Sequence, residues 1–321
     1  MDPLLGCTLT ILIISIGFII WYLFVTVCLF NCLHKSPTFI LLFSQALNDI
    51  YALSQCAWQP IISLAGVPEE SFLPDRWLSV IHGSFELISL PHYIIIALNR
   101  ALFLIDHTKM NIIFSRRNTI VICLTMWTIP LLANILLHIF SEEDDDGFYL
   151  FSTSHLEMGG DNLGLTLTSF LGLVSDLCFY ATVVIVVVTY IIAIVWHSYK
   201  KRAFLSSSGS SSDGSSPSFG MEMRLTIVCL VNLVPPTITT IIEYTWADRG
   251  TAGSFIFALG TVGDNAVNSI VLPAFSQLLR ECMKKKAKSI LCARRTPEVQ
   301  KVDPKLFERR RSTVTTFVPP A

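Results

Sequence analysis

Charged residues are scarce in this sequence. Only 15% of its 321 residues are charged, whereas 52% are hydrophobic, and the mean hydropathy is +0.59. A soluble domain usually carries about 25% charged residues. The shortage falls in long apolar stretches, and roughly 20 apolar residues span a bilayer as a helix whose backbone groups bond within the segment. The sequence therefore predicts an all-α membrane protein that crosses the bilayer several times.

Several functional signatures are also missing. The chain has no HExxH, GxSxG, P-loop or CxxC pair, so it is not predicted to be an enzyme. None of its nine cysteines falls in a predicted outer loop. An extracellular disulfide could therefore form only with a cysteine at the end of a helix. There is no paired pattern of broken helices of the kind that many transporters show. Nothing in the sequence indicates nucleic-acid binding or a metal site.

Seven hydrophobic segments are present, and together they predict a seven-helix bundle. The Lys and Arg residues divide unevenly: with the N-terminus outside, 21 lie on or near the inner side and two lie outside. This asymmetry predicts an outer N-terminus and a cytoplasmic C-terminus. The predicted spans are approximately Leu4–Phe30, Thr38–Ala65, Trp77–Ile105, Asn118–Phe140, Leu163–Trp196, Arg224–Trp246 and Ser254–Leu279.

The chain divides into a membrane domain, residues 1–279, and a basic cytoplasmic tail, residues 280–321. The tail is predicted to begin with a short amphipathic helix and then to be disordered. Its Lys and Arg residues would lie beside an anionic inner leaflet, where each gains about 1 kcal/mol. Cys282 and Cys292 are candidates for lipidation on this side of the membrane.

The third span carries a polar stripe. At 100° per residue, five residues fall within about 40° of one bearing, and such a stripe must face the bundle interior because lipid would leave it unsatisfied. His82 and Glu86, near the outer third, either contact a ligand or satisfy each other. Arg100, about 27 Å further along the helix, would present a cation to the cytoplasm. The stripe consists of His82, Glu86, Ser89, Tyr93 and Arg100.

Further polar groups interrupt the second and seventh spans. Asp49 lies in the middle of the second span and Asp264, Asn265 and Asn268 interrupt the seventh. These groups either hold a cation or a water network, or one aspartate is protonated because of burial and of the other carboxylate. In the sixth span, two consecutive prolines in "VNLVPPT" remove backbone donors and predict a kink that can act as a pivot.

The segment "IIIALNRALFLIDHTKMNIIFSRRNT" resembles the end of helix three and the second inner loop of rhodopsin-like G-protein-coupled receptors. It is more similar still to the nematode chemoreceptors called serpentine receptor class X. Asn99 and Arg100 stand where most rhodopsin-like receptors have Asp/Glu-Arg-Tyr. "LNDIYAL" looks like the helix-two aspartate motif, and Trp127 matches the helix-four tryptophan. "DNAVN" with the later Phe275 is similar to the helix-seven motif.

The resemblance implies several roles. Asn99 and Arg100 would couple to a G protein when helix six swings outward about Pro235 and Pro236. A sodium ion or water cluster near Asp49 would set the activation balance, in a pocket lined by Asp49, Ser89, Asp264 and Asn268. The chain also departs from the pattern: helix one lacks the usual asparagine, and Asn99 replaces an acid, which alters the inactive-state lock. These departures predict either unusual basal activity or a degenerate receptor.

These observations favour a chemosensory G-protein-coupled receptor. A small molecule, contacted by His82 and Glu86, would bind in the outer half of the bundle, and the partners would be a heterotrimeric G protein and membrane lipids. The expected location is the plasma membrane, with the sensory cilium as a candidate site. The alternatives are a transporter or ion channel that uses Asp49, Glu86 and Asp264, and a seven-span protein without a signalling role.

Overall fold

The computed structural model describes residues 3–65, 73–140, 150–152, 157–159, 167–207, 231–245 and 250–295. The chain forms two compact units, Met1–Cys282 and Met283–Ala321. The first unit contains the helical bundle, and the described part of the second continues the last helix. The helices are α1 (Pro3–Phe30), α2 (Pro37–Ala65), α3 (Leu73–Ile105), α4 (His107–Ile113), α5 (Arg116–Phe140), α6 (Leu167–Ser207), α8 (Val234–Thr245), α9 (Gly250–Phe275) and α10 (Gln277–Arg295).

The long helices follow the predicted hydrophobic segments closely. Within the described ranges, four stretches are long and apolar enough to cross a membrane: Leu5–Phe30, Leu87–Ile105, Leu177–Trp196 and Ala252–Phe275. The helix α2 is as long as these but carries buried Gln45, Asn48 and Asp49, which lower its apolarity. The predicted sixth span begins in residues that lie outside the described ones, so only its second half, α8, can be compared.

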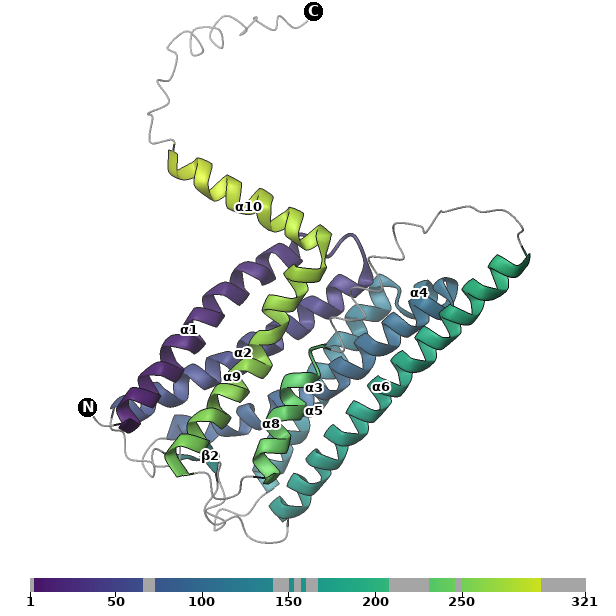
Figure 1. Ribbon diagram of the computed structural model, residues 1–321. Coiled ribbons are helices and arrows are strands. Elements are labelled where there is room, and N and C mark those ends of the chain that lie inside the picture. The colour runs from purple at the N-terminus through teal and green to yellow at the C-terminus, as the bar shows by residue number, and fades with distance from the viewer. Residues whose placement is uncertain are drawn as a thin grey trace, which may run out of the picture. The chain divides into compact units, whose positions relative to one another are not determined.

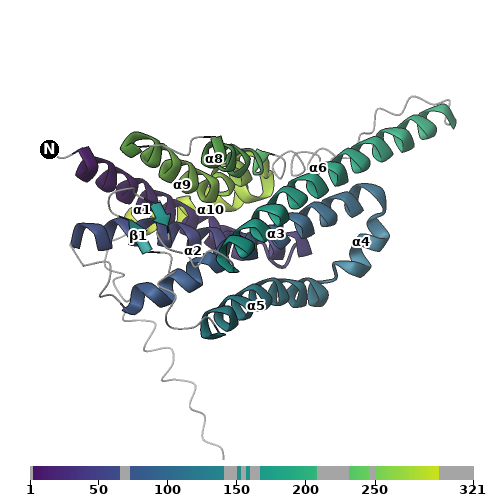
Figure 2. The same ribbon diagram turned by 90° about the horizontal axis from the view of Figure 1, so that it is seen from below.

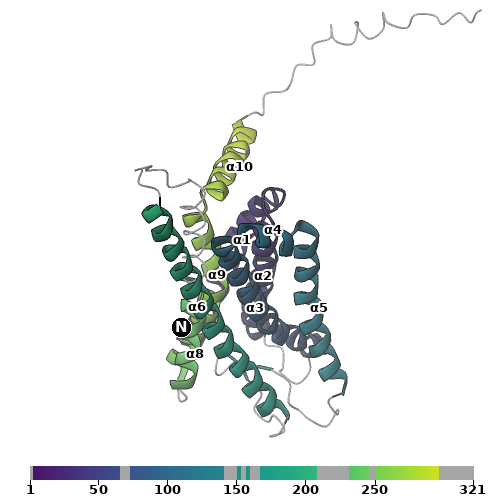
Figure 3. The same ribbon diagram turned by 90° about the vertical axis from the view of Figure 1, so that its right-hand side faces the viewer.

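Helices α2 and α3 occupy the middle of the bundle. Helix α1 packs against α2 and α9, α6 packs along α3, α5 contacts α2 and α3, and α8 packs against α9. Figure 1 shows these helices as a bundle of long, roughly aligned rods. Figures 2 and 3 show α2 and α3 between α5 on one side and α8 and α9 on the other. This arrangement brings polar side chains from α1, α2, α3, α8 and α9 into a shared interior.

The outward faces of the helices are apolar, as expected for helices surrounded by lipid. On α1, Ile13 is 69% exposed and Ile20 is 64% exposed, whereas Tyr22 and Val25 are buried. Large side chains along α6 are exposed as well; they include Leu177, Val184, Ile191 and Val195. A soluble protein would bury such residues, so the bundle exposes apolar surface outside and keeps polar groups inside.

Two details differ from the expected layout. Two short antiparallel strands, β1 (Leu150–Ser152) and β2 (Glu157–Gly159), lie between α5 and α6, so the fold is not purely helical. The predicted seventh span is too long at its inner end: α9 stops at Phe275 and α10 begins at Gln277. At this break, the Ser276 hydroxyl accepts a hydrogen bond from the amide of Leu279, which caps the first turn of α10.

The sixth helix is interrupted at its proline pair. Asn232 and Leu233 form a turn, and α8 begins immediately afterwards at Val234. Pro235 and Pro236 thus occupy the first turn of α8, where the missing backbone donors cost nothing because those amides have no intrahelical acceptor. The first half of the predicted span, up to residue 230, lies outside the described residues, so the kink between the two halves stays a prediction.

Candidate functional site

The centre of the bundle holds a buried carboxylate, Asp49, whose side chain is only 1% exposed. The Tyr22 hydroxyl donates to Oδ2 at 2.5 Å, and the Asn268 amide donates to the same oxygen at 2.8 Å. The Gln45 amide donates to Oδ1 at 2.6 Å. Burying a charge without partners is very costly, and hydrogen bonds to a charged acceptor are among the strong ones. These three donors therefore hold Asp49 and, with it, join α1, α2 and α9.

Two further amides extend this network to other helices. The Asn48 amide donates to the Ser89 hydroxyl at 2.7 Å, which joins α2 to α3. The Asn232 amide donates to Oδ1 of Asn268, which joins the turn before α8 to α9. Polar contacts thus connect five elements around Asp49.

The structure brings together part of the pocket that the sequence predicts. Asp49 and Asn268 are in direct contact, and Ser89 joins them through Asn48. Asp264 accepts a hydrogen bond from the Thr239 hydroxyl of α8 at 3.1 Å. It therefore provides a second link between α8 and α9, about one helical turn from Asn268.

A separate polar cluster fixes α2, α3 and α5 to one another. His92 is fully buried, its Nδ1 lies 2.7 Å from the Ile88 carbonyl oxygen, and its Nε2 lies 2.8 Å from the Ser44 hydroxyl. The Trp127 indole donates to the same hydroxyl at 3.0 Å. A neutral imidazole satisfies both contacts, since Nδ1–H donates to the carbonyl and Nε2 accepts from Ser44.

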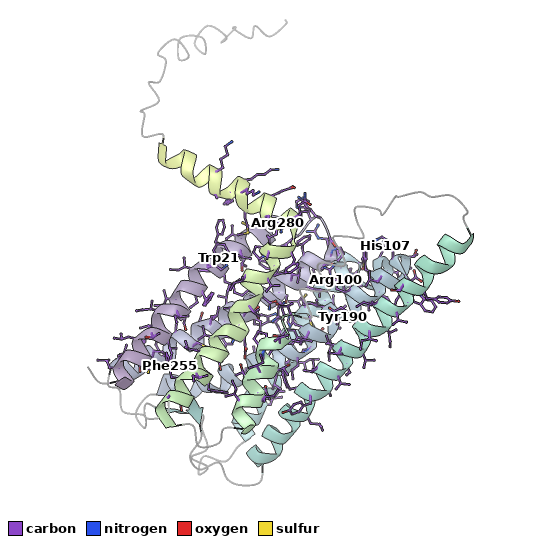
Figure 4. The ribbon with its side chains drawn as sticks, in the orientation of Figure 1. Trp21, Arg100, His107, Tyr190, Phe255 and Arg280 are labelled. Carbon is purple, nitrogen blue, oxygen red and sulfur yellow. The ribbon has the colours of Figure 1, made fainter. Side chains whose placement is uncertain are left out.

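Asn99 and Arg100, near the end of α3, lie in the interior. The Thr38 hydroxyl of α2 donates to Oδ1 of Asn99 at 2.8 Å. Arg100 is only 2% exposed, so it does not present its charge to solvent as the sequence suggested. Figure 4 shows Arg100 and Tyr190 within the bundle. Small residues close this end, because Ala101 and Leu104 pack against Ala193 of α6.

An apolar cluster around Tyr190 completes this half of the bundle. Tyr190 and Val186 of α6 pack with Ala97 of α3 and with Leu233, which precedes α8. The segment before α8 therefore touches the helix that carries Arg100. Any displacement of α8 must change this cluster.

Some predicted residues can be placed only in part. His82 and Glu86 belong to α3, but their side chains lie outside the described ones, so the ligand contact remains a prediction. The side chain of Cys292 also lies outside the described ones. Cys282, at the start of α10, contacts the Cys28 carbonyl oxygen at 3.6 Å.

Cys32, in the loop after α1, neighbours Cys282. Burial, with a smaller contribution from the neighbouring Cys282 thiol, raises the pKa of the Cys32 thiol to about 11. Because the thiolate is the reactive form of cysteine, this environment keeps Cys32 unreactive near neutral pH.

The sequence analysis missed Tyr22, although a signal for it exists. Thr8, Ser15, Tyr22 and Thr26 recur at spacings of seven and four, which places them on one face of a helix, and all four are buried. Tyr22 gives the first helix a polar contact with the second, because its hydroxyl donates to Asp49.

A protein-family model described as the serpentine type 7TM GPCR chemoreceptor Srv matches residues 11–246. The chain belongs to this family. The match covers α1 to α8 and therefore includes Asp49 and Arg100. No curated protein matches the chain.

Membership of the Srv family settles the broad class. The protein is a multi-pass membrane protein of a seven-helix chemoreceptor family, and this family is one of receptors rather than enzymes. The narrower resemblance to class X is not confirmed, since the matching model is that of Srv. That resemblance rested on Ile94–Thr119, a short segment, whereas the family model spans most of the bundle.

Proposed function

We propose that this Srv-family receptor signals through a heterotrimeric G protein when helix six, of which α8 is the second half, pivots at Pro235 and Pro236 and uncovers Arg100. The single observation that carries this proposal is the burial of Arg100, which is 2% exposed. Leu233 packs with Ala97 on the same helix as Arg100. The cation is thus covered in this state and needs a helix displacement to reach a partner.

The proline pair supplies the pivot for this displacement. The turn at Asn232 and Leu233, followed by Pro235 and Pro236, interrupts the regular hydrogen bonding of the helix. Displacing α8 would break the amide contact from Asn232 to Asn268 and the contact from Thr239 to Asp264. A ligand that binds the displaced state better than the resting state shifts the population toward signalling.

The ligand would be a small molecule bound in the outer half of the bundle, with His82 and Glu86 as contacts. A carboxylate at Glu86 favours a ligand with a positive charge or a hydrogen-bond donor. The excess of Lys and Arg on one side of the predicted spans supports an outer N-terminus and a cytoplasmic tail. The plasma membrane, including that of a sensory cilium, is the location that fits these roles.

The channel or transporter alternative finds less support. It requires Asp49 to lie on a path for water and ions, yet Asp49 is 1% exposed and both of its oxygens accept hydrogen bonds from protein donors. A receptor needs no such path.

The test is nucleotide exchange on a G protein by the purified full-length chain in lipid nanodiscs. Exchange is measured first without ligand and then with a panel of volatile and small soluble compounds. Arg100→Ala should abolish exchange while leaving the amount of folded protein unchanged. Arg117→Ala is the matched control, because Arg117 is an exposed arginine of the same inner region. Exchange that is equal in wild type and Arg100→Ala would refute the role of Arg100.

A further inference from the structure

The charge on Asp49 determines how the neighbouring amides are oriented. Gln45 and Asn268 both direct their nitrogen atoms at the carboxylate, so their amide oxygens must point away from it. Oδ1 of Asn268 accepts from the nitrogen of Asn232, so the oxygen of Asn232 points away in turn. A side-chain amide carries its donor and its acceptor on opposite sides. The carboxylate of Asp49 therefore fixes the orientation of the amides of Gln45, Asn268 and Asn232.

Two of these amide oxygens remain without a partner within the part of the chain that the structure describes. Oε1 of Gln45 and Oδ1 of Asn232 are buried and find no hydrogen-bond partner among the described residues. The two side chains are 3% and 5% exposed. Both line one cavity of about 20 Å³, which is otherwise mostly apolar. An unpaired buried acceptor costs about 1–3 kcal/mol, so a ligand that donates to both oxygens would be favoured.

The cavity has the size and the chemistry for one water molecule. By this measure a cavity needs about 10–15 Å³ to hold a water, and water has two O–H groups for the two oxygens. A cation fits less well. Around Asp49, hydrogens from Tyr22, Gln45 and Asn268 already face the carboxylate and would repel a positive charge. Hard cations in proteins require several oxygen ligands, and the cavity offers only two unpaired acceptors.

We propose that a single buried water bridges Oε1 of Gln45 and Oδ1 of Asn232, and that no sodium ion binds at Asp49. The water joins α2 to the turn that precedes α8. Under the function proposed above, it restrains α8 in the resting position and is released when α8 moves. Gln45 and Asn232 are thus positioning residues for the resting state.

The direct test is the density of the full-length receptor in nanodiscs, at a resolution that reveals other buried waters. A peak within hydrogen-bonding distance of both oxygens, without further oxygen neighbours, is expected. An empty cavity would overturn the proposal. A peak surrounded by four or more oxygens, or a peak beside Asp49, would identify a cation and overturn it as well.

A substitution in the cavity wall gives an independent test, because the water and a dry cavity predict opposite changes in the midpoint of thermal unfolding. Val186 lines the cavity and is 1% exposed, so Val186→Ile places a methyl group where the water would lie. Displacing the water leaves two unpaired acceptors, and the midpoint of thermal unfolding should fall by about 2–4 °C together with loss of the density peak. If the cavity is dry, filling it would raise the midpoint of thermal unfolding. A lower midpoint with the density peak retained would mean that the added methyl group only crowds its neighbours. Either result overturns the proposal.

Further controls test the buried water independently of the proposed coupling to a G protein. Val188→Ile, on the same helix and 46% exposed, should leave the midpoint unchanged. Replacing NaCl with KCl or choline chloride should also leave it unchanged, in the wild type and in Asp49→Asn alike. A midpoint of thermal unfolding that is higher in sodium than in the other salts, with this difference lost in Asp49→Asn, would refute the proposal. None of these measurements involves a G protein, so failure of the coupling proposal would not affect them.

Discussion

The two sides of this bundle are held together by different kinds of contact. On the side of α1, α2 and α9, directional hydrogen bonds dominate: Tyr22 and Asn268 donate to Asp49, and the Trp21 indole donates to the Ser269 carbonyl at 3.1 Å. Between α3, α6 and the start of α8, buried apolar clusters built on Ala97, Ala101 and Ala193 make the contact. Hydrogen bonds fix one geometry, whereas small apolar side chains allow packed helices to slide over each other.

This difference assigns distinct tasks to the two sides. The hydrogen-bonded side can act as a fixed frame, and the side with small apolar contacts can supply the displacement that uncovers Arg100. The amide pair Asn232 and Asn268 lies at the boundary, since it joins the start of α8 to the frame. Substitutions on the two sides should therefore differ in kind, with large losses of stability on the first and changes in basal signalling on the second.

The largest effect is expected for Asn268→Leu. This change removes one of the three donors to Asp49 and leaves the Asn232 amide without its acceptor. Because hydrogen bonds to charged groups contribute most and an orphaned buried donor adds its own cost, the free energy of unfolding should fall by about 3–5 kcal/mol. Denaturant unfolding in micelles measures this. Thr125→Val, at an exposed hydroxyl that bonds only within its own helix, is the control, and equal losses in the two variants would contradict the assignment of the frame.

A smaller loss is expected for Tyr22→Phe. The phenyl ring keeps its packing, but the 2.5 Å hydrogen bond to Asp49 disappears, so unfolding should become easier by about 1.5–3 kcal/mol. Tyr199→Phe removes a hydroxyl from a residue that is 67% exposed and should change little. A Tyr22→Phe receptor as stable as wild type would show that α1 is held by packing alone.

The sequence predicted the frame only in part, and the reason is physical. The length of each hydrophobic segment predicts helices such as α1, α2 and α9. The polar residues Asp49 and Asn268 within these segments indicate a shared polar interior, because lipid offers them no hydrogen-bond partners. The sequence pattern does not say how far one helix is shifted along its axis relative to another. That shift determines that Asn268, and not Asp264, donates to Asp49. For the same reason Tyr22 could be recognised as an inward residue but not as a partner of Asp49.

Local features were harder to predict than the bundle. The end of α9 at Phe275 depends on Ser276 capping the next helix, a short-range signal inside a continuous apolar run. The strands Leu150–Ser152 and Glu157–Gly159 are only three residues each, too few for an alternating pattern to stand out. The close approach of α6 to α3 rests on alanines such as Ala101 and Ala193, whose sequence signal is weak.

On the sliding side, Ala193→Leu tests the role of small residues. Ala193 is fully buried against Ala101 and Leu104, so a larger side chain should push α6 away from α3. Overpacking of this kind costs about 1 kcal/mol or somewhat more, and basal nucleotide exchange should rise because Arg100 becomes accessible. Ile192→Leu, at a neighbouring position that is 55% exposed, serves as the control. Reduced stability without any rise in exchange would argue against this side as the moving one.

The smallest effect concerns the end of the frame where Cys32 and Cys282 meet. Cys32 is 1% exposed, and its raised pKa of about 11 leaves roughly one molecule in a thousand as thiolate at pH 8. Cys282 is partly exposed, so maleimide should label it first, as peptide mass spectrometry of the full-length protein in nanodiscs would reveal. Labelling of Cys32 should rise about tenfold per pH unit between pH 7 and 9, since both values lie below its pKa.

Cys282→Ser provides the matched comparison for this pair. Removing the neighbouring thiol takes away one of the contributions that raise the pKa of Cys32, so Cys32 should react faster in this variant at the same pH. Equal labelling of the two cysteines at pH 7 would contradict the closed packing of α1 against the start of α10. The same difference in access bears on lipidation, because acyl transfer needs a reachable thiol: of this pair, Cys282 and not Cys32 is the expected acceptor, and the frame would then be anchored in the membrane where α9 passes into α10.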